Sequence, residues 1–266
     1  MISDLGIIVP AHDEEAEIIG CLQSIIKAIS HARRGLHSKA NGLRVTSSHL
    51  EETSSRESGT DYQAGTTEFR VIVVADACAD GTVSLVENFI SAHPVVELLI
   101  TDVNNVGRAR NAGVELFLKT SGDASQLRSP AAEQAWLALT DADSHVPVHW
   151  VSAHLQAAED SDCLVGTVAP RVETGSPELI GRWHAAHELD EQHAYVFGAN
   201  LGIRASLFDA IGGIPPLATG EDAAVVDAIL AKGGRVWRSD SCRVLTSARL
   251  DGRAPGGFST YLRGLV

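Results

Sequence analysis

The sequence WLALTDAD, residues 136–143, joins a short apolar run to two acids that stand one residue apart. A run of this kind, bounded by polar residues, is typical of a buried strand. Three further polar or acidic motifs also follow apolar runs, and they are VPAHDEE (9–15), DACADGT (76–82) and NVGRARNAG (105–113). Ligands of open α/β sheets bind at the carboxyl ends of the strands. The four motifs together therefore predict one α/β sheet with a ligand site at that edge.

Short β-branched runs alternate with amphipathic stretches, which predicts a mainly parallel sheet with helices on both faces. The expected strands are Leu5–Val9, Phe69–Ala75, Val95–Thr101, Trp136–Thr140 and Leu164–Val168. The first helix is expected to begin near Asp13 as its N-cap, because the acids that follow suit the positive end of the helix dipole. Its apolar face is expected to comprise Ile18, Ile19, Leu22, Ile25, Ile26 and Ile29.

The length of 266 residues fits one large α/β domain, and we expect residues 1–266 to form a single domain. Residues 35–67 are rich in Ser, Thr, Gly, Glu and Arg and show little periodic hydrophobicity. This composition predicts a mobile insertion, since a compact domain rarely contains so long a loop. Residues 120–134 are expected to form a shorter surface loop.

The net charge of −13 excludes nucleic acid as a partner and disfavours a general attraction to anionic membranes. No stretch approaches the roughly 20 apolar residues of a membrane-spanning helix, and no basic leader precedes the first expected strand. We therefore expect a soluble, cytoplasmic protein, for which a peripheral encounter with a membrane stays open. The cysteines are far apart and form no CxxC pair, so free thiols are expected at Cys21, Cys78, Cys163 and Cys242.

The ordered motifs resemble glycosyltransferase family 2 over nearly the whole chain apart from residues 35–67. Pro10–Glu15 is similar to the family pattern P-x-x-N/D-E-E, and Asp76–Thr82 is similar to D-x-S-x-D-G-T with Cys78 at the serine position. The pattern N-x-G-x-x-x-A-R-N-x-G is matched, one residue shorter, by Asn105, Gly107, Arg110, Asn111 and Gly113. The D-x-D, G-x-N-x-x-x-R and Glu-Asp motifs are matched by Asp141-Ala142-Asp143, by Gly198, Asn200 and Arg204, and by Glu221-Asp222. The resemblance implies the GT-A fold, a Rossmann-like α/β/α sandwich with a mainly parallel central sheet.

The resemblance also implies a site for a UDP- or GDP-sugar donor. Carboxylates accept hydrogen bonds from base N–H groups and ribose hydroxyls, and arginine suits bidentate contact with phosphate. The residues expected at this site are Pro10, Ala11, His12, Asp13, Glu15, Asp76, Asp80, Gly107, Arg110, Asp141, Arg249 and Arg253. Simpler readings stay open, since Asp13 also fits a helix cap, Asp76 a turn, and the two late arginines a solvated surface.

Asp143 is expected to ligate Mn2+ or Mg2+, because hard cations prefer carboxylate and phosphate oxygens. Asp141, two positions earlier, can point the same way in an extended chain and would hold hydroxyls or a metal-bound water. The cation would help the nucleoside diphosphate to leave as a Lewis acid. Some members of the family supply a later histidine ligand, whereas this chain has no histidine after His193.

Asp222, with Glu221, is the candidate catalytic base, since inverting transfer needs a carboxylate near the acceptor hydroxyl. The alternative is that these acids only cap a helix over residues 223–232. The acceptor itself is unknown. On its side we expect Asn200, and Trp183 from a helix over Pro177–His193, as contacts for a sugar ring. A zinc site at His184, His187 and His193 is disfavoured, because no motif supplies the third ligand.

The sequence also bears on three other functions. A nucleotidyltransferase usually needs a basic, Gly-rich loop after the first strand, where this chain has AHDEE. A nicotinamide-dependent dehydrogenase needs G-x-G-x-x-G at the same place. A non-catalytic nucleotide-sugar-binding protein of the same fold stays open, although the four acids Asp76, Asp141, Asp143 and Asp222 favour an enzyme.

Overall fold

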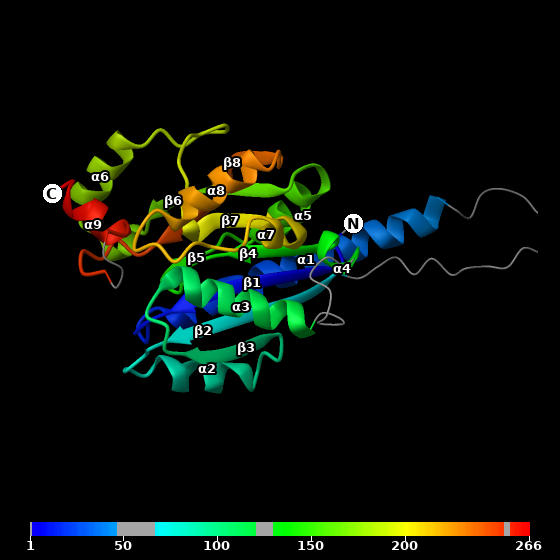
Figure 1. Ribbon diagram of the computed structural model, residues 1–266, viewed down its shortest axis with the longest axis horizontal. Coiled ribbons are helices and arrows are strands. Elements are labelled where there is room, and N and C mark those ends of the chain that lie inside the picture. The colour runs from blue at the N-terminus through cyan, green and yellow to red at the C-terminus, as the bar shows by residue number, and fades with distance from the viewer. Residues whose placement is uncertain (1, 47–66, 121–129, 253–255) are drawn as a thin grey trace, which may run out of the picture.

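The computed structural model describes residues 2–46, 67–120, 130–252 and 256–266. In these ranges the chain forms an eight-stranded sheet of order β3-β2-β1-β4-β7-β6-β8-β5 (Figure 1). The strands are β1 Asp4–Ala11, β2 Glu68–Asp76, β3 Val96–Thr101, β4 Ala135–Leu139, β5 Ser144–His145, β6 Cys163–Pro170, β7 Leu201–Arg204 and β8 Val236–Thr246. β3, β2, β1 and β4 are parallel neighbours, β8 is parallel to β6, and β7 and β5 run antiparallel to their neighbours. The predicted mainly parallel sheet is confirmed.

Helices cover both faces of this sheet. The helices of the described ranges are α1 Ile18–Thr46, α2 Thr82–Ile90, α3 Val106–Thr120, α4 Pro130–Glu133, α5 Trp150–Asp160, α6 Pro177–Ala186, α7 Ala205–Ala210, α8 Glu221–Ala231 and α9 Phe258–Arg263, with 3-10 turns at Val172–Thr174 and Gly198–Asn200. α1, α2 and α5 pack on one face, and α3, α7 and α8 pack on the other. None of the helices within the described ranges has the length and apolar character needed to cross a membrane.

The alternation of side chains along β1 explains the two layers. Ile7 and Val9 point to the α1 side, Ile8 points to the α3 side, and all three are fully buried. Burying such a side chain stabilises the fold by about 1.5–3 kcal/mol. Gly6 admits the ring of Phe117 from α3, because a Cβ at Gly6 would lie 2.8 Å from that ring.

The first helix differs from its prediction at both ends. The expected apolar face is confirmed, since Ile18, Leu22, Ile25 and Ile29 are buried and Ile19 and Ile26 pack against them. The expected N-cap at Asp13 is wrong, because α1 begins only at Ile18 and Asp13 has a left-handed φ of 53°. The helix also continues to Thr46, so the first part of the expected insertion is helical. Figure 1 shows this end of α1 reaching beyond the sheet. Residues 47–66 of that insertion and 121–129 of the second expected loop lie outside the described residues.

α6 and α9 form a small third cluster beside the main core, near the C-terminus in Figure 1. α6 ends at Ala186, whereas the sequence predicts a helix to His193. The chain turns extended at His187, where φ is −128° and ψ is 114°. His193 therefore does not share a helix with His184 and His187. All four cysteines are free, as predicted.

Candidate active site

Three tight turns follow the strands that lead into the site. Asp13 after β1, Ala77 after β2 and Asn104 after β3 have φ values of 53°, 51° and 48°. Residues other than glycine rarely adopt this left-handed conformation, and such strain persists only where surrounding contacts impose it. The turns redirect the chain as soon as each strand ends, so that three loops meet at one edge of the sheet.

Asp76, the last residue of β2, organises the loop between β3 and α3. Its Oδ1 accepts hydrogen bonds from Thr101 Oγ1 at 3.1 Å, from Val103 N at 2.7 Å and from Asn104 N at 3.2 Å. Its Oδ2 accepts one from Asn105 N at 3.1 Å. The side chain is buried, and backbone donors satisfy most of its capacity. Asp76 therefore fixes the wall of the site by holding this loop.

The loops after β1 and β2 are tied to each other by acidic side chains. Asp13 Oδ1 accepts from Ala79 N at 2.7 Å, and Asp80 Oδ2 accepts from Glu15 N at 3.0 Å. Glu15 Oε2 accepts in turn from Gly81 N at 2.8 Å. Hydrogen bonds to charged acceptors are among the stronger ones in proteins. The predicted donor-site acids thus hold the loops in shape.

Pro10 and Ala11, also expected at the donor site, are the last residues of β1. The next residue, His12, places Nδ1 2.6 Å from the backbone carbonyl oxygen of Asp76. This contact adds a further tie between the ends of β1 and β2.

Arg110 links two acids from distant parts of the chain. It lies in α3 with a side chain that is 3% exposed. Nη2 lies 2.6 Å from Asp141 Oδ1, and Nη1 lies 2.9 Å from Glu221 Oε1. Both guanidinium ends are therefore occupied by carboxylates. Arg110, which the sequence analysis assigns to the donor site, contacts protein acids in this structure.

Asp143 belongs to a second ion-pair group, with Arg249 and Glu14. Arg249 Nη2 lies 3.2 Å from Asp143 Oδ2, and Nη1 donates to Glu14 Oε2 at 2.6 Å. Oδ1 of Asp143 accepts a hydrogen bond from Thr246 Oγ1 at 3.2 Å. Burial, followed by the neighbouring charge of Asp141, raises the pKa of Asp143 to about 7. The side chain thus lies where a nearby positive charge would be stabilising.

Asp222 lies close to the first of these groups. Its Oδ2 accepts from Gly198 N at 2.9 Å, and its Oδ1 accepts from Ala223 N at 2.7 Å at the start of α8. A Cβ at Gly198 would lie 2.8 Å from Arg110 Nη2, so the backbone at Gly198 touches both Asp222 and Arg110. The structure therefore brings Asp141 of the D-x-D motif together with both acids of the Glu-Asp motif around one arginine.

The family model described as Glycosyl transferase family 2 matches residues 61–212, which is more than half of the chain. The chain belongs to glycosyl transferase family 2. Among solved structures it is similar to S. aureus TarS 1-349 in complex with UDP-GlcNAc, with a TM-score of 0.59 and 15% identity over 97% of this chain and 60% of that one. No curated relative matches it by sequence.

Two further structures show the same fold. The mannosyltransferase PcManGT from Pyrobaculum calidifontis, in complex with GDP-Man and Mn2+, gives a TM-score of 0.59 and 16% identity over 97% of this chain and 68% of that one. GalNAc-T7 with UDP, GalNAc and Mn2+ gives a TM-score of 0.60 and 13% identity over 95% of this chain and 46% of that one. The fold is thus the GT-A fold of glycosyltransferases, as predicted. The family 2 chain spans about 60% of the length of the TarS structure.

Gly107 lies at the start of α3, where the segment before α8 packs on it. A Cβ at Gly107 would lie 2.8 Å from the backbone oxygen of Pro215. Asn105 Nδ2 reaches the same segment and donates to Leu217 O at 3.2 Å. This glycine thus lets the segment that leads to Glu221 approach the loop between β3 and α3.

Two expected sugar contacts of the family 2 chain need correction. Trp183 is fully buried and its ring stacks on His187 with centroids 4.2 Å apart, so it offers no free face to a sugar. Asn200 is also fully buried, and its amide is already used inside the protein. Its Nδ2 donates to Thr167 O at 2.8 Å, and its Oδ1 accepts from Trp150 Nε1 at 2.8 Å. Both residues therefore shape the core. Arg253 lies outside the described residues.

Glu14 is a site residue that the sequence predicts only as a favourable charge near a helix start. It is 7% exposed and pairs with Arg249 across 235 positions of the chain. Its place in the motif Pro10–Glu15 could have indicated this role, because an acid that becomes buried needs a charged or polar partner.

A second group of possible metal ligands lies in the loops rather than at the D-x-D motif. Within the described ranges, ligand atoms of Asp13, Cys78 and Asp80 lie within 4.8 Å of one another. Asp13 and Asp80 already accept backbone N–H groups, and burial raises the pKa of the Cys78 thiol above its ordinary value of 9.0. Because metals bind the thiolate form, this group is better explained as the tie between loops.

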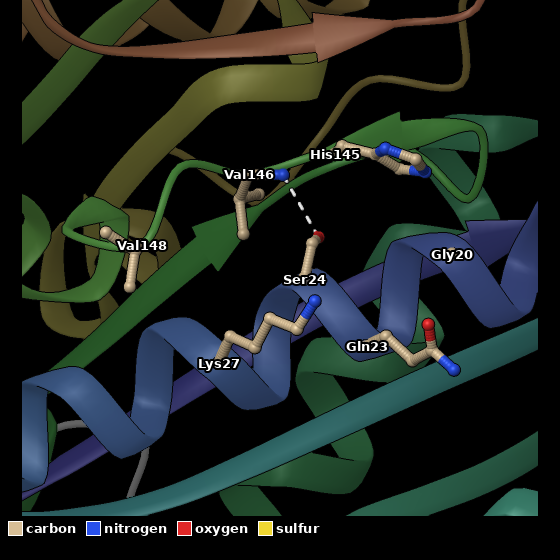
Figure 2. A pocket seen from close by; sticks show the side chains of 7 residues that line it. All are labelled: Gly20, Gln23, Ser24, Lys27, His145, Val146 and Val148. Carbon is tan, nitrogen blue, oxygen red and sulfur yellow. Dashed lines mark hydrogen bonds between the residues drawn. The ribbon is translucent and has the colours of Figure 1, made fainter.

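A hollow of about 300 Å³ lies between α1 and the segment around β5 (Figure 2). Its walls are Gly20, Gln23, Ser24, Lys27, His145, Val146 and Val148. Ser24 Oγ accepts a hydrogen bond from Val146 N at 3.0 Å across it. None of these walls carries a carboxylate, so the hollow does not form part of the acidic site.

Proposed function

We propose that this family 2 chain transfers a sugar from a UDP- or GDP-sugar to an acceptor hydroxyl, with inversion, using a divalent cation and Asp222 as the base. One observation carries the proposal. Arg110 contacts Asp141 and Glu221, and the backbone next to it at Gly198 hydrogen-bonds to Asp222. The acids expected to serve the donor and the acceptor thus lie around one buried guanidinium.

The charges at this site fit a divalent cation. Arg110 pairs with Asp141 and Glu221, and Arg249 pairs with Glu14 and Asp143. A fifth carboxylate, that of Asp222, lies close by and accepts a hydrogen bond from Gly198 N. Burial, followed by the neighbouring charge of Asp141, raises the pKa of Asp143, so a positive charge beside this carboxylate would be stabilising. Asp143 and Asp141 would hold Mn2+ or Mg2+ together with oxygens of the diphosphate. A bound cation would offset the charge that develops on the leaving nucleoside diphosphate.

The donor nucleotide would lie over the loops that follow β1, β2 and β3. Their shape is fixed by Asp76, Asp13 and Asp80, which leaves backbone groups at the edge of the sheet to contact the base and ribose. Similar folds are known in complex with UDP-GlcNAc and with GDP-Man, which supports a nucleotide-sugar donor. Arg249, whose Nη2 lies 3.2 Å from Asp143 Oδ2, would contact the diphosphate.

In the transfer step, the acceptor hydroxyl oxygen forms a bond to the anomeric carbon as the bond from that carbon to the diphosphate oxygen breaks. The hydroxyl proton passes to a carboxylate oxygen of Asp222. Hydrogen bonds from Gly198 N and Ala223 N orient this carboxylate and leave lone pairs on both oxygens. The diphosphate leaves on the opposite face of the sugar, which inverts the anomeric centre.

The test measures two quantities on the same variants. A ligand that binds the folded state raises the thermal midpoint, so UDP, GDP and their sugars are screened with and without MnCl2. Slow release of nucleoside diphosphate, with water as acceptor, is then followed with the sugar donor that binds. Asp143→Ala should lose the Mn2+-dependent rise. Asp222→Asn should keep the rise and lose release by about 10²–10⁴-fold.

Asp160→Asn, at the exposed end of α5, serves as a control and should match the wild type in both assays. Binding without any turnover in the wild type would favour a non-catalytic nucleotide-sugar-binding protein. An absence of any midpoint shift at millimolar nucleotide with MnCl2 would contradict the donor site itself.

A further inference from the structure

Arg249 occupies the space beside the oxygen expected to bind a metal. It follows β8 by three residues, and its Nη2 lies 3.2 Å from Asp143 Oδ2. Nη1 and Nη2 also donate hydrogen bonds to the two carboxylate oxygens of Glu14. The exposed fractions of these side chains are 27% for Arg249, 16% for Asp143 and 7% for Glu14. The three charges therefore interact where solvent screens them only in part.

A divalent cation on Asp143 would compete with this guanidinium. The other oxygen of Asp143, Oδ1, already accepts from Thr246 Oγ1, so Oδ2 is the oxygen best placed to bind an ion. An ion on Oδ2 would come close to Nη2 of Arg249, and two positive charges at that separation repel each other strongly in a partly buried site. Asp143 thus favours either the arginine or the cation.

Glu14 determines how far Arg249 can move. Its carboxylate is almost fully buried, and leaving a buried charge unpaired is strongly unfavourable. The bidentate contact with Glu14 therefore keeps the arginine in the site when its contact with Asp143 breaks. A guanidinium has five N–H donors in a planar fork, so one that keeps two bonds to Glu14 can still donate to a diphosphate.

We infer that Arg249 acts as an internal counter-ion of Asp143, and that a nucleoside diphosphate draws it away so that the divalent cation can take its place. The inference rests on the proposed donor site. It adds that the cation and the nucleotide each change how tightly the other binds there. Each ligand removes an obstacle to the other, because the diphosphate engages the guanidinium and the cation neutralises the diphosphate. Such coupling is reciprocal, so each ligand raises the affinity for the other by the same factor.

The experiment measures Mn2+ affinity by the loss of the free-ion electron paramagnetic resonance signal, on the full chain, with MnCl2 alone and with UDP or GDP added. In the wild type the nucleotide should raise Mn2+ affinity by roughly 5–150-fold, the usual range of such coupling. Arg249→Gln removes the competing charge, so Mn2+ alone should bind about 10-fold more tightly or better. The nucleotide should then raise Mn2+ affinity far less than in the wild type.

Arg243→Gln is the matched control, because this arginine lies in β8 and pairs with Asp240 three residues away. It should leave both Mn2+ constants unchanged. Where Arg249→Gln folds poorly, judged by circular dichroism, the double variant Glu14→Gln/Arg249→Gln removes the unpaired buried acid and should show the same loss of coupling.

Unchanged or weaker binding of Mn2+ alone in both arginine-free variants, with the nucleotide effect intact, would overturn the counter-ion role and leave the donor site standing. A wild type that binds neither Mn2+ nor nucleotide, separately or together, would overturn the donor site and this inference together.

Discussion

Nη2 of Arg110 lies 2.6 Å from Oδ1 of Asp141, across 31 positions of the chain. The arginine lies near the start of α3, and the acid lies in the turn after β4. The guanidinium is 3% exposed and Asp141 is 37% exposed, so a buried arginine holds a carboxylate that faces solvent. The helix that follows the third strand thus positions the first acid of the D-x-D motif.

Replacing Arg110 should therefore damage stability as well as function. Arg110→Met leaves Glu221, whose side chain is 12% exposed, without its partner. Removing one partner of a buried ion pair costs about 3–5 kcal/mol. Urea denaturation should show a loss of this order, and the Mn2+-dependent midpoint shift with nucleotide should disappear.

Lys119→Met offers the comparison, because Lys119 pairs with Glu115 on the exposed surface of α3. Its loss should cost no more than about 0.5 kcal/mol. Adding Glu221→Gln to Arg110→Met should restore part of the stability, since it removes the unpaired charge. A loss below about 1 kcal/mol in Arg110→Met would contradict a buried positioning role.

Asp143 should make stability fall as pH rises. Its pKa is raised from 3.8 to about 7, chiefly by burial. Between these values the folded state holds a proton that the unfolded chain has released, so the free energy of unfolding decreases with increasing pH. Asp143→Asn cannot release a proton there. In metal-free buffer with a chelator, the variant should gain on the wild type from pH 4 to 7, by more than about 1 kcal/mol.

The check is a series of thermal midpoints, in which about 1 kcal/mol corresponds to roughly 2–4 °C for a chain of this size. Asp160→Asn, at the exposed end of α5, should follow the wild type throughout. Equal midpoint differences between Asp143→Asn and the wild type at pH 4 and pH 8 would show that Asp143 titrates normally.

His154 should act in the opposite direction on the acid side. It is fully buried in α5, accepts a hydrogen bond on Nδ1 from Trp136 Nε1 at 3.0 Å, and burial lowers its pKa from 6.5 to about 3. Below pH 6.5 the unfolded chain binds a proton that the folded state refuses, so stability is lost as pH falls. The slope reaches about 1.4 kcal/mol per pH unit.

His154→Asn should be less stable than the wild type at pH 7, because it loses packing, yet less sensitive to acid. The asparagine amide oxygen can still accept from Trp136. Denaturation at pH 7 and pH 5 measures the effect, and the gap between variant and wild type should narrow at the lower pH. A constant gap would mean that His154 titrates alike in both states.

The strands that the sequence predicts, such as β1, β2 and β4, each contain an uninterrupted run of apolar residues. β8 was not predicted, since it carries charged and polar residues such as Arg238, Asp240 and Arg243 between its buried positions. β5 has only two residues, Ser144 and His145, and exists because β8 lies beside it. Pairing of this kind is a tertiary effect that local pattern does not carry.

The candidate site also divides into residues that the sequence could predict and contacts that it could not. The family resemblance pointed to Asp141, Glu221 and Asp222 as site residues, and the structure places all three around Arg110. Their partners could not be predicted, because an ion pair such as Arg249 with Glu14 depends on the packing of distant elements. Trp183 shows the limit for apolar side chains, since an aromatic residue in an amphipathic helix fits a sugar platform and a core equally well until its neighbours are known.

The backbone at Gly198 lies against both Asp222 and Arg110. Its N–H donates to Asp222, and a Cβ there would lie 2.8 and 2.9 Å from the two terminal nitrogens of Arg110. Gly198→Ala therefore requires Arg110 or the backbone to shift, which costs about 1–3 kcal/mol in a packed site. Because both responses disturb an acid of the site, release of nucleoside diphosphate should fall at least about 10-fold, as small misplacements of catalytic groups do.

Gly181→Ala is the matched substitution, because a Cβ at this position in α6 meets no atom within 4 Å. It should stabilise the protein slightly, by about 0.4–1 kcal/mol, and leave release unchanged. Nucleotide affinity separates the two ways in which Gly198→Ala can act. A shift of Arg110 moves Asp141 and weakens nucleotide binding, whereas a shift of the backbone moves Asp222 and lowers release alone. Full release in Gly198→Ala would show that Asp222 works without this anchor.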